Sequence, residues 1–185
     1  MKQRLFIAIN LPPKIKAEIF DAVEALRKKN PRLEAKWVEE ENLHLTLHFL
    51  GYVEEEKIPA LIKDLEKSVR SFSSFSLNIG QAGGFPSVSR PRVIFIKTAE
   101  PTGTLKNIHR TLGQILEKHN IKIDKRPYQG HITLTRLKFP VAVCGLEKTG
   151  EKISFDCPIK SVDLMQSCLS RSGPTYMIVK SFNLT

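Results

Sequence analysis

The chain of 185 residues has few cysteines and no long apolar run, and each shortage excludes a class of protein. Its three cysteines, Cys144, Cys157 and Cys168, are odd in number and lack Cys-x-x-Cys spacing, so they predict neither a disulfide framework nor a zinc site. No window approaches the roughly 18 apolar residues of a membrane-spanning helix. The apolar run at residues 5–9 is too short for a signal peptide. We therefore expect a cytoplasmic protein.

Acidic residues are also scarce, because 29 lysines and arginines face only 19 aspartates and glutamates, which gives a net charge of +10. Such an excess favours polyanionic partners through steering and counterion release. The alternative is a basic surface that is merely well solvated, so charge alone does not establish nucleic-acid binding. The length and the lack of low-complexity tracts predict one compact domain over residues 1–185.

The sequence does contain a four-residue motif that occurs twice, as His44-Leu45-Thr46-Leu47 and as His131-Ile132-Thr133-Leu134. Around both copies, apolar and polar residues alternate with the period of two that is typical of a half-buried strand. Histidine and threonine then project from one face of each strand, about 6–7 Å apart, and the aliphatic residues project from the other. An imidazole and a hydroxyl could therefore contact the same phosphate-sized group.

Similar elements precede the two motifs. A strand and an amphipathic helix are expected before each histidine, with the strands at residues 4–10 and 93–96. The helices are expected to begin after the prolines at 12–13 and after the turn at 101–103. This order predicts two copies of a helix-on-sheet unit that face each other across a cleft, with one motif in each lobe.

The remaining segments are assigned from the same patterns. A second helix is expected after the acidic residues 54–56, and further strands are expected around residues 36–38, 75–79, 160–167 and 176–182. Residues 83–91 are expected to form a loop, and residues 141–152 are expected to be irregular.

Two imidazoles brought to one centre can supply both an acid and a base. With an ordinary pKa of about 6.5, one can be neutral while the other is charged at cellular pH. Such a pair suits an in-line phosphoryl displacement in which Thr46 and Thr133 donate hydrogen bonds to the non-bridging oxygens. A single histidine on a strand is more often a packing or surface residue, so the argument depends on the repetition.

Zinc binding is the alternative, because His44 and His48 have the i, i+4 spacing of the His-Glu-x-x-His helix. Position 45 is leucine instead of the general-base glutamate, and a strand separates i and i+4 by about 13 Å. We therefore expect no metal and no cofactor. Strict alternation puts His48 on the face of His44, where it lines the cleft or faces solvent.

Arg136 closes the second motif and could hold a phosphate with its fork of donors. Strict alternation places it opposite His131, so it reaches the site only if the strand twists, bulges or ends there. Candidates for phosphate-backbone contacts, each of which could equally be a plain surface residue, are Lys36, Arg90, Arg92, Lys138 and Arg171. A base could stack on Trp37, Phe49 or Phe85. Core packing is expected of Trp37 and Phe49, whereas Phe85 lies in a glycine-rich loop and is expected to be open.

Further segments, taken with the two motifs, are similar to one protein family. They are Arg4-Leu5-Phe6-Ile7-Ala8-Ile9, Trp37-Val38, Glu41-Asn42-Leu43, Phe49-Leu50-Gly51, Gly84-Phe85-Pro86, Arg92-Val93-Ile94, Arg136, Ser167, Gly173-Pro174 and Tyr176. Over nearly its whole length the chain resembles the two-histidine (2H) phosphoesterases, specifically the RNA 2′,3′-cyclic phosphodiesterases, once called 2′-5′ RNA ligases. It departs from the family pattern at Gln129-Gly130 and at His48.

The resemblance implies a bilobal α+β fold with two pseudo-symmetric antiparallel sheets, helices on the outer faces and a central cleft. It also implies metal-free opening of a terminal 2′,3′-cyclic phosphate of RNA to a 2′-phosphate. His44 then donates a proton to the leaving 3′ oxygen, and His131 accepts one from water. The alternative is an RNA-end binding protein, or a 2′-5′ RNA ligase that runs the reverse reaction, because the same histidines serve both directions. We expect a monomer without a membrane partner.

Overall fold

The computed structural model describes residues 1–149, 153–170 and 173–185. Its strands are β1 (Lys2–Asn10), β2 (Ala35–Trp37), β3 (His44–Glu54), β4 (Phe75–Phe85), β5 (Val93–Ala99), β6 (His131–Leu137), β7 (Ser154–Ile159), β8 (Ser161–Ser170) and β9 (Gly173–Asn183). Its α-helices are α1 (Pro13–Lys29), α2 (Ile58–Val69), α3 (Thr104–Lys118) and α4 (Leu146–Thr149). Short 3-10 turns, η1 (Glu40–Asn42) and η2 (Glu55–Lys57), precede β3 and α2.

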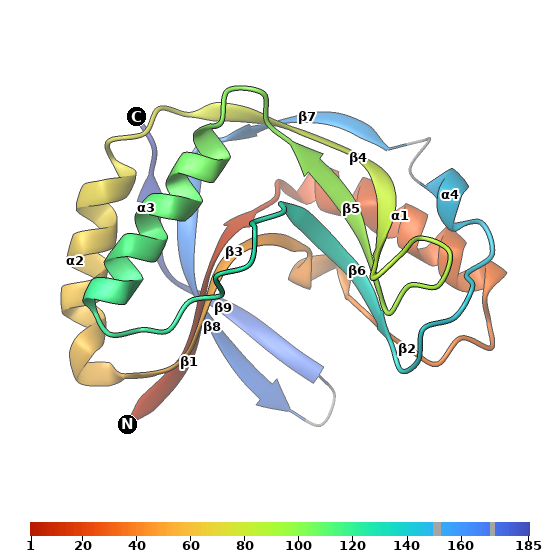
Figure 1. The fold of residues 1–185 in the computed structure, drawn as a ribbon, viewed down its shortest axis with the longest axis horizontal. Helices are drawn as coiled ribbons and strands as arrows, with labels where there is room; N and C mark the ends of the chain where they lie inside the picture. Colours follow the sequence, from red (N-terminus) through yellow and green to blue (C-terminus); the bar gives the residue numbers. More distant parts are fainter. Residues whose placement is uncertain (150–152, 171–172) are drawn as a thin grey trace.

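The strands form one antiparallel sheet in the order β7-β4-β5-β6-β3-β1-β8-β9, with β2 paired to β6. In the middle of this order β3 meets β6, where Leu45 lies opposite Ile132. Figure 1 shows the sheet strongly bent, with α2 and α3 beside one half and α1 and α4 beside the other. The expected bilobal α+β fold is confirmed, and the two expected sheets are the joined halves of one.

The two halves repeat the same strand arrangement about the β3–β6 pair. Counting outward from it, β1 corresponds to β5, β8 to β4 and β9 to β7. The registers also correspond, because Asn10 of β1 lies opposite His44 and Lys97 of β5 lies opposite His131. Equal lengths of chain separate these partners, so each motif enters its half of the sheet in the same way.

The helices cover the sheet with the apolar faces that their periodicity predicts. In α2 and α3 the buried residues recur at steps of three and four: Ile58, Leu61, Leu65 and Val69, then Leu105, Ile108, Leu112 and Leu116. α1 begins at Pro13 and ends before Asn30, whose side-chain amide donates to the carbonyl of Leu26 at 2.9 Å. Burial of each such side chain contributes roughly 1.5–3 kcal/mol.

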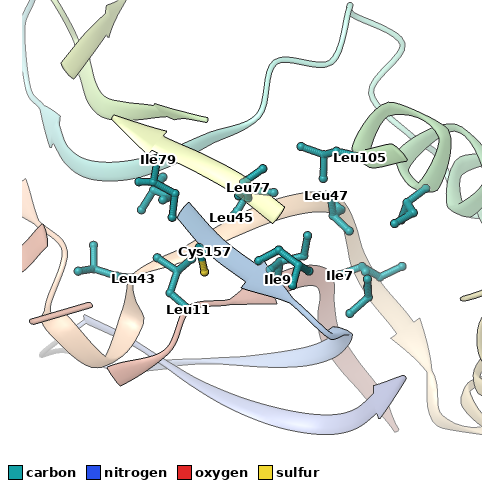
Figure 2. Close-up of a cluster of buried hydrophobic side chains, with 14 of the residues drawn as sticks. Ile7, Ile9, Leu11, Leu43, Leu45, Leu47, Leu77, Ile79, Leu105 and Cys157 are labelled. Carbon is teal, nitrogen blue, oxygen red and sulfur yellow. The ribbon is translucent and has the colours of Figure 1, made fainter. Parts of the chain in front are cut away.

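A single hydrophobic cluster extends under both halves of the sheet. Figure 2 shows side chains from β1, β3, β4, β7 and α3 packed together, and those labelled include Ile7, Ile9, Leu45, Leu47, Leu77, Ile79, Leu105 and Cys157. The aliphatic residues of both motifs, among them Leu45 and Ile132, are fully buried in it. The histidine and threonine of each motif therefore face away from this core, as alternation predicts.

Three segments differ from the sequence-based expectation. Residues 83–85, expected to form a loop, continue β4 in register with β5, and the ring of Phe95 fills the space beside Gly83, where an added Cβ would lie only 2.6 Å from it. β7 was not expected at all. The segment 141–152 was expected to be irregular and contains α4, which contacts β4, while residues 150–152 lie outside the described part.

No helix in the described ranges is long and apolar enough to cross a membrane. Cys144 and Cys168 are exposed, Cys157 is buried in the core, and all three are free thiols. The fold is therefore held by packing and backbone pairing, without a disulfide.

Candidate active site

The two motif histidines are held by equivalent hydrogen bonds. Nδ1 of His44 lies 2.7 Å from the carbonyl oxygen of Asn42, and Nδ1 of His131 lies 2.8 Å from the carbonyl oxygen of Gln129. A carbonyl oxygen only accepts, so each Nδ1 carries the proton and donates it. In the neutral ring this leaves Nε2 as an acceptor, directed away from the bonded carbonyl.

The hydroxyl of Thr46 lies 2.8 Å from Nε2 of His44 and donates to it when the ring is neutral. Thr133 occupies the corresponding place in β6, where it lies opposite Phe95 of β5 and borders the same pocket as His131. The histidine and threonine of each motif therefore share a face, as expected.

A one-residue bulge follows the threonine in both strands. In β3, Thr46 lies opposite Ala8 and His48 lies opposite Ile7, which leaves Leu47 as the extra residue. In β6, Thr133 lies opposite Phe95 and Thr135 opposite Ile94, so Leu134 is extra. A bulge of one residue reverses the alternation beyond it, and here it does so at the same position of each motif.

In β6 the bulge brings Arg136 to the face of His131 and into the pocket wall. Strict alternation would place Arg136 opposite His131 unless the strand bulged, and the strand does bulge here. The Arg136 guanidinium contributes to lowering the pKa of both motif histidines, so it lies within electrostatic range of each. Thr135 turns inward instead and donates to the carbonyl of Lys36 at 3.0 Å.

In β3 the bulge turns His48 off the face of His44, and the expectation that they share a face is wrong. His48 is only 4% exposed, and its Nε2 donates to the carbonyl oxygen of His109 at 2.8 Å. Its ring stacks on that of His109, which in turn stacks on Tyr128, with centroids 4.0 Å apart in both pairs. The stack borders the pocket from the side of α3.

The aromatic candidates are distributed differently from the expectation. Phe49 is 62% exposed in the pocket wall, so its expected place in the core is wrong, again because the bulge reverses the alternation. Trp37 does pack against the core. Phe85 also borders the pocket; its ring stacks on Phe95 with centroids 4.4 Å apart and meets the His131 ring edge-on at 5.4 Å.

A pocket of about 590 Å³ lies between the two motif strands. It is bounded by β3, β6, α3, the start of β5, the end of β4 and the segment before β6. The residues that line it are Thr46, Leu47, His48, Phe49, Phe85, Val93, His109, Asp124, Arg126, Pro127, Tyr128, Gln129, His131, Thr133 and Arg136. The His44 ring is more enclosed, since it packs against Phe6 at 5.1 Å and meets Tyr176 edge-on at 5.3 Å.

Burial and neighbouring cations keep both motif histidines neutral in the free protein. Burial, followed by the charges of Lys16, of His131 when it is protonated, and of Arg136, lowers the pKa of His44 to about 4, although the hydrogen bond to Asn42 acts to raise it. Burial and then Arg136 lower the pKa of His131 as well. An anion bound between them favours the protonated forms and raises both pKa values. The site can therefore gain a proton when a phosphate arrives.

The segment before β6 contacts both motifs, a role that the sequence pattern does not predict. The Tyr128 hydroxyl donates to the backbone carbonyl of Thr46 at 3.2 Å, while the next residue, Gln129, holds His131. Burial raises the pKa of the Tyr128 hydroxyl above its usual range, so it stays a donor. The contact spans distant parts of the chain, and no periodicity or motif in the sequence could have indicated it.

The basic candidates for phosphate-backbone contacts are not in the pocket wall. The side chains of Lys36, Arg90, Arg92 and Lys138 are exposed outside it, and Lys138 pairs with Glu34 at 2.9 Å. Arg171 lies outside the described residues. In the described part of the chain, no three histidine, cysteine or acidic side chains are grouped so that they could hold a metal ion.

Comparison with known proteins gives consistent matches over the whole chain. The family model described as LigT like Phosphoesterase matches residues 9–95 and again residues 96–176, so each matched segment contains one motif. An RNA 2′,3′-cyclic phosphodiesterase of Thermotoga maritima is 34% identical, covering 95% of this chain and 92% of that protein. One of Methanocaldococcus jannaschii is 32% identical, with 97% and 99% covered.

Solved structures match equally well. The protein TT0787 of Thermus thermophilus has a TM-score of 0.79 at 28% identity, with 97% of each chain covered. The LigT protein of E. coli in complex with 3′-AMP has a TM-score of 0.78 at 28% identity, with 100% of this chain and 99% of that chain covered. On these matches and the paired motifs, the chain belongs to the LigT-like family of two-histidine phosphoesterases.

Proposed function

We propose that this enzyme is an RNA 2′,3′-cyclic 3′-phosphodiesterase, which opens the terminal cyclic phosphate of RNA to a 2′-phosphate. The observation that carries the proposal is the pair of equivalently held imidazoles, His44 and His131, on neighbouring strands beside one pocket. The substrate class comes from the related proteins, which are named RNA 2′,3′-cyclic phosphodiesterases. The net charge of +10 suits such a polyanion.

In the proposed reaction His131 accepts a proton from water as the water oxygen bonds to phosphorus. The bond from phosphorus to the 3′ oxygen breaks, and protonated His44 gives its proton to that oxygen. The products are a 2′-phosphate and a free 3′ hydroxyl. The roles are supported by the bonds at Nδ1, which direct Nε2 of each ring away from the backbone. Nε2 of His44 reaches the 3′ oxygen once the Thr46 hydroxyl, 2.8 Å away in the free protein, turns to the phosphate.

The remaining pocket residues are proposed to hold the phosphate. Thr46 and Thr133 donate to its non-bridging oxygens, and Arg136 supplies a charged fork of donors to the same group. The negative charge of the bound phosphate favours the protonated form of His44, which is neutral in the free protein. Binding thus prepares the acid that the reaction consumes. None of these steps requires a metal or a cofactor.

We further propose that residues 1–185 act as one domain of two lobes, with one motif in each lobe, and that the protein works as a monomer in the cytoplasm. Both histidines belong to one chain: His131 lines the pocket, and His44 contacts the lining residue Thr46, so the site needs no second copy. Its three free cysteines suit a reducing compartment.

The test is to incubate the protein with an RNA that ends in a 2′,3′-cyclic phosphate and to identify the product end. We expect a 2′-phosphate, with turnover reduced about 10²–10⁴-fold by His44→Ala or by His131→Ala. His119→Ala is the matched control, because His119 pairs with Asp64 away from the pocket. Full activity in either motif variant would refute the mechanism. Tight binding without turnover would indicate an RNA-end binding protein, and formation of a 2′-5′ linkage from the product would show the reverse reaction.

A further inference from the structure

Two phenylalanine rings face the pocket from opposite halves of the sheet. Phe85 belongs to β4, and its ring is edge-on to His131 at 5.4 Å. Phe49 belongs to β3, and it is 62% exposed although it lies in the pocket wall. A terminal nucleotide has only one base, so it can cover one of these rings and leaves the other in water.

The position of Phe49 is the counterpart of that of Arg136. Each residue is the third after the motif threonine, and each is brought to the pocket face by the bulge that follows the threonine. The pseudo-symmetric halves thus place a guanidinium at one side of the site and an apolar ring at the other. The β6 side suits the phosphate charge, and the β3 side suits an uncharged planar group.

A neighbouring aromatic ring packs against Phe49 and holds it in place as a surface for stacking. Phe6 lies opposite Phe49 in the β1–β3 register, with ring centroids 6.2 Å apart, and Phe6 also packs against the His44 ring. Exposure of so large an apolar side chain sacrifices the stabilisation that burial would bring. Nucleic-acid bases stack on such rings with little regard to sequence.

On the basis of the proposed function, we propose that Phe49 forms a second base subsite, which stacks the base of the nucleotide preceding the terminal one. Phe85 and Phe49 then hold two successive bases on either side of the reacting phosphate. The enzyme is accordingly specific for oligonucleotide ends over free cyclic mononucleotides.

The experiment compares adenosine 2′,3′-cyclic phosphate with the dinucleotide ApA that ends in the same cyclic phosphate. We expect the wild type to have the higher kcat/KM on the dinucleotide. Phe49→Ala should lower kcat/KM on the dinucleotide about tenfold more than on the mononucleotide, within the range measured for loss of a base–aromatic stack. A dinucleotide whose first residue is abasic should reproduce this loss in the wild type, with little further loss when Phe49→Ala is added. Phe49→Trp should retain the preference.

Tyr52→Ala is the matched control, because Tyr52 is an exposed aromatic residue of the same strand outside the pocket wall. Equal losses on both substrates, or no dinucleotide preference in the wild type, would overturn the second subsite while leaving the phosphodiesterase intact. Affinity for the 2′-phosphate products of both substrates, measured by calorimetry, gives the same comparison without turnover. If neither cyclic phosphate is opened, the proposed function fails and the product affinities still decide the subsite.

Discussion

At the scale of single residues, Arg136 should act on the two histidines in the free protein and on the phosphate in the proposed complex. In the free protein its charge contributes to lowering the pKa of both His44 and His131. Once a phosphate is bound, the guanidinium stabilises the anion instead. The same side chain therefore favours neutral imidazoles in the free protein and, in the proposed function, helps to hold the charged ligand.

Arg136→Met tests this double role. The variant should raise the pKa of His44 and of His131 in the free protein, because a neighbouring positive charge is removed. It should nevertheless lower kcat/KM about 10–100-fold, the effect of a lost hydrogen bond to a charged group. NMR titration of the imidazole protons and steady-state kinetics measure the two effects. Arg32→Met, which removes an exposed charge elsewhere, is the control; unchanged titration in Arg136→Met would contradict the electrostatic assignment.

The sequence was sufficient to identify the residues of the repeated motifs but insufficient to place those just beyond them. His44, Thr46, His131 and Thr133 precede the bulges, so strict alternation predicts their face correctly. Arg136, Phe49 and His48 follow the bulges, and alternation is reversed there. Leucine occupies both bulge positions and is also the ordinary residue of a buried strand, so nothing in the residue type marks the irregularity.

At the scale of elements, the chain packs tightly against β5 and α3 where it enters the second motif. Gly130 leaves no room for a side chain, because a Cβ there would lie 2.5 Å from the Thr98 hydroxyl and 3.2 Å from Leu105. The backbone amide of Thr98 also donates to the carbonyl of Gly130 at 3.3 Å. The position of His131, the next residue, therefore depends on this contact.

Gly130→Ala should accordingly lower kcat by a larger fraction than it lowers the midpoint of chemical denaturation, because the displaced backbone moves His131. Adding Thr98→Ala should restore much of the activity, since it removes the hydroxyl that the new methyl group meets. Thr98→Ala alone should be nearly neutral, because its buried hydroxyl has no hydrogen-bond partner in the described structure. Steady-state kinetics on the four proteins give the comparison. Losses that simply add would contradict the steric explanation.

The hydrophobic period of the sequence does not predict every strand or strand end. β7 contains Pro158, which argues against a strand, but β7 lies at the edge of the sheet, where a missing backbone donor is tolerated. The glycines at 83 and 84 resemble a loop, yet they extend β4 because neighbouring side chains fill the space above them. Both cases depend on what lies beside the strand, which the local pattern does not contain.

At the scale of the whole molecule, the buried imidazoles make stability depend on pH. The pKa values of His44 and His109 are lowered to about 4, and those of His48 and His131 are also lowered, with burial as the first cause in each case. Between pH 6.5, the ordinary pKa of histidine, and about pH 4, the unfolded chain binds protons that the folded chain does not. The free energy of unfolding therefore falls as the pH is lowered through this window.

Chemical denaturation at pH 7.5 and at pH 4.5 should reveal this loss, with His44 and His109 each contributing on the order of 1–3 kcal/mol when allowance is made for partial exposure. His109→Phe is the informative variant, because it keeps a ring in the stack between His48 and Tyr128 and removes one titrating group. Its stability should depend less on pH than that of the wild type. An equal dependence would show that other groups cause the acid sensitivity.

The pairing of β3 with β6 has a mechanical consequence. Leu45 and Ile132 join the halves, and each directly follows one of the motif histidines, so both imidazoles are attached beside the joint. When two bodies rotate about a joint, a point is displaced in proportion to its distance from it. Any flexing of the halves would leave the spacing of His44 and His131 almost constant, whereas β7 and β9, at the two ends of the sheet, would travel along longer arcs. The two histidines therefore lie at the point of the sheet that moves least when it bends.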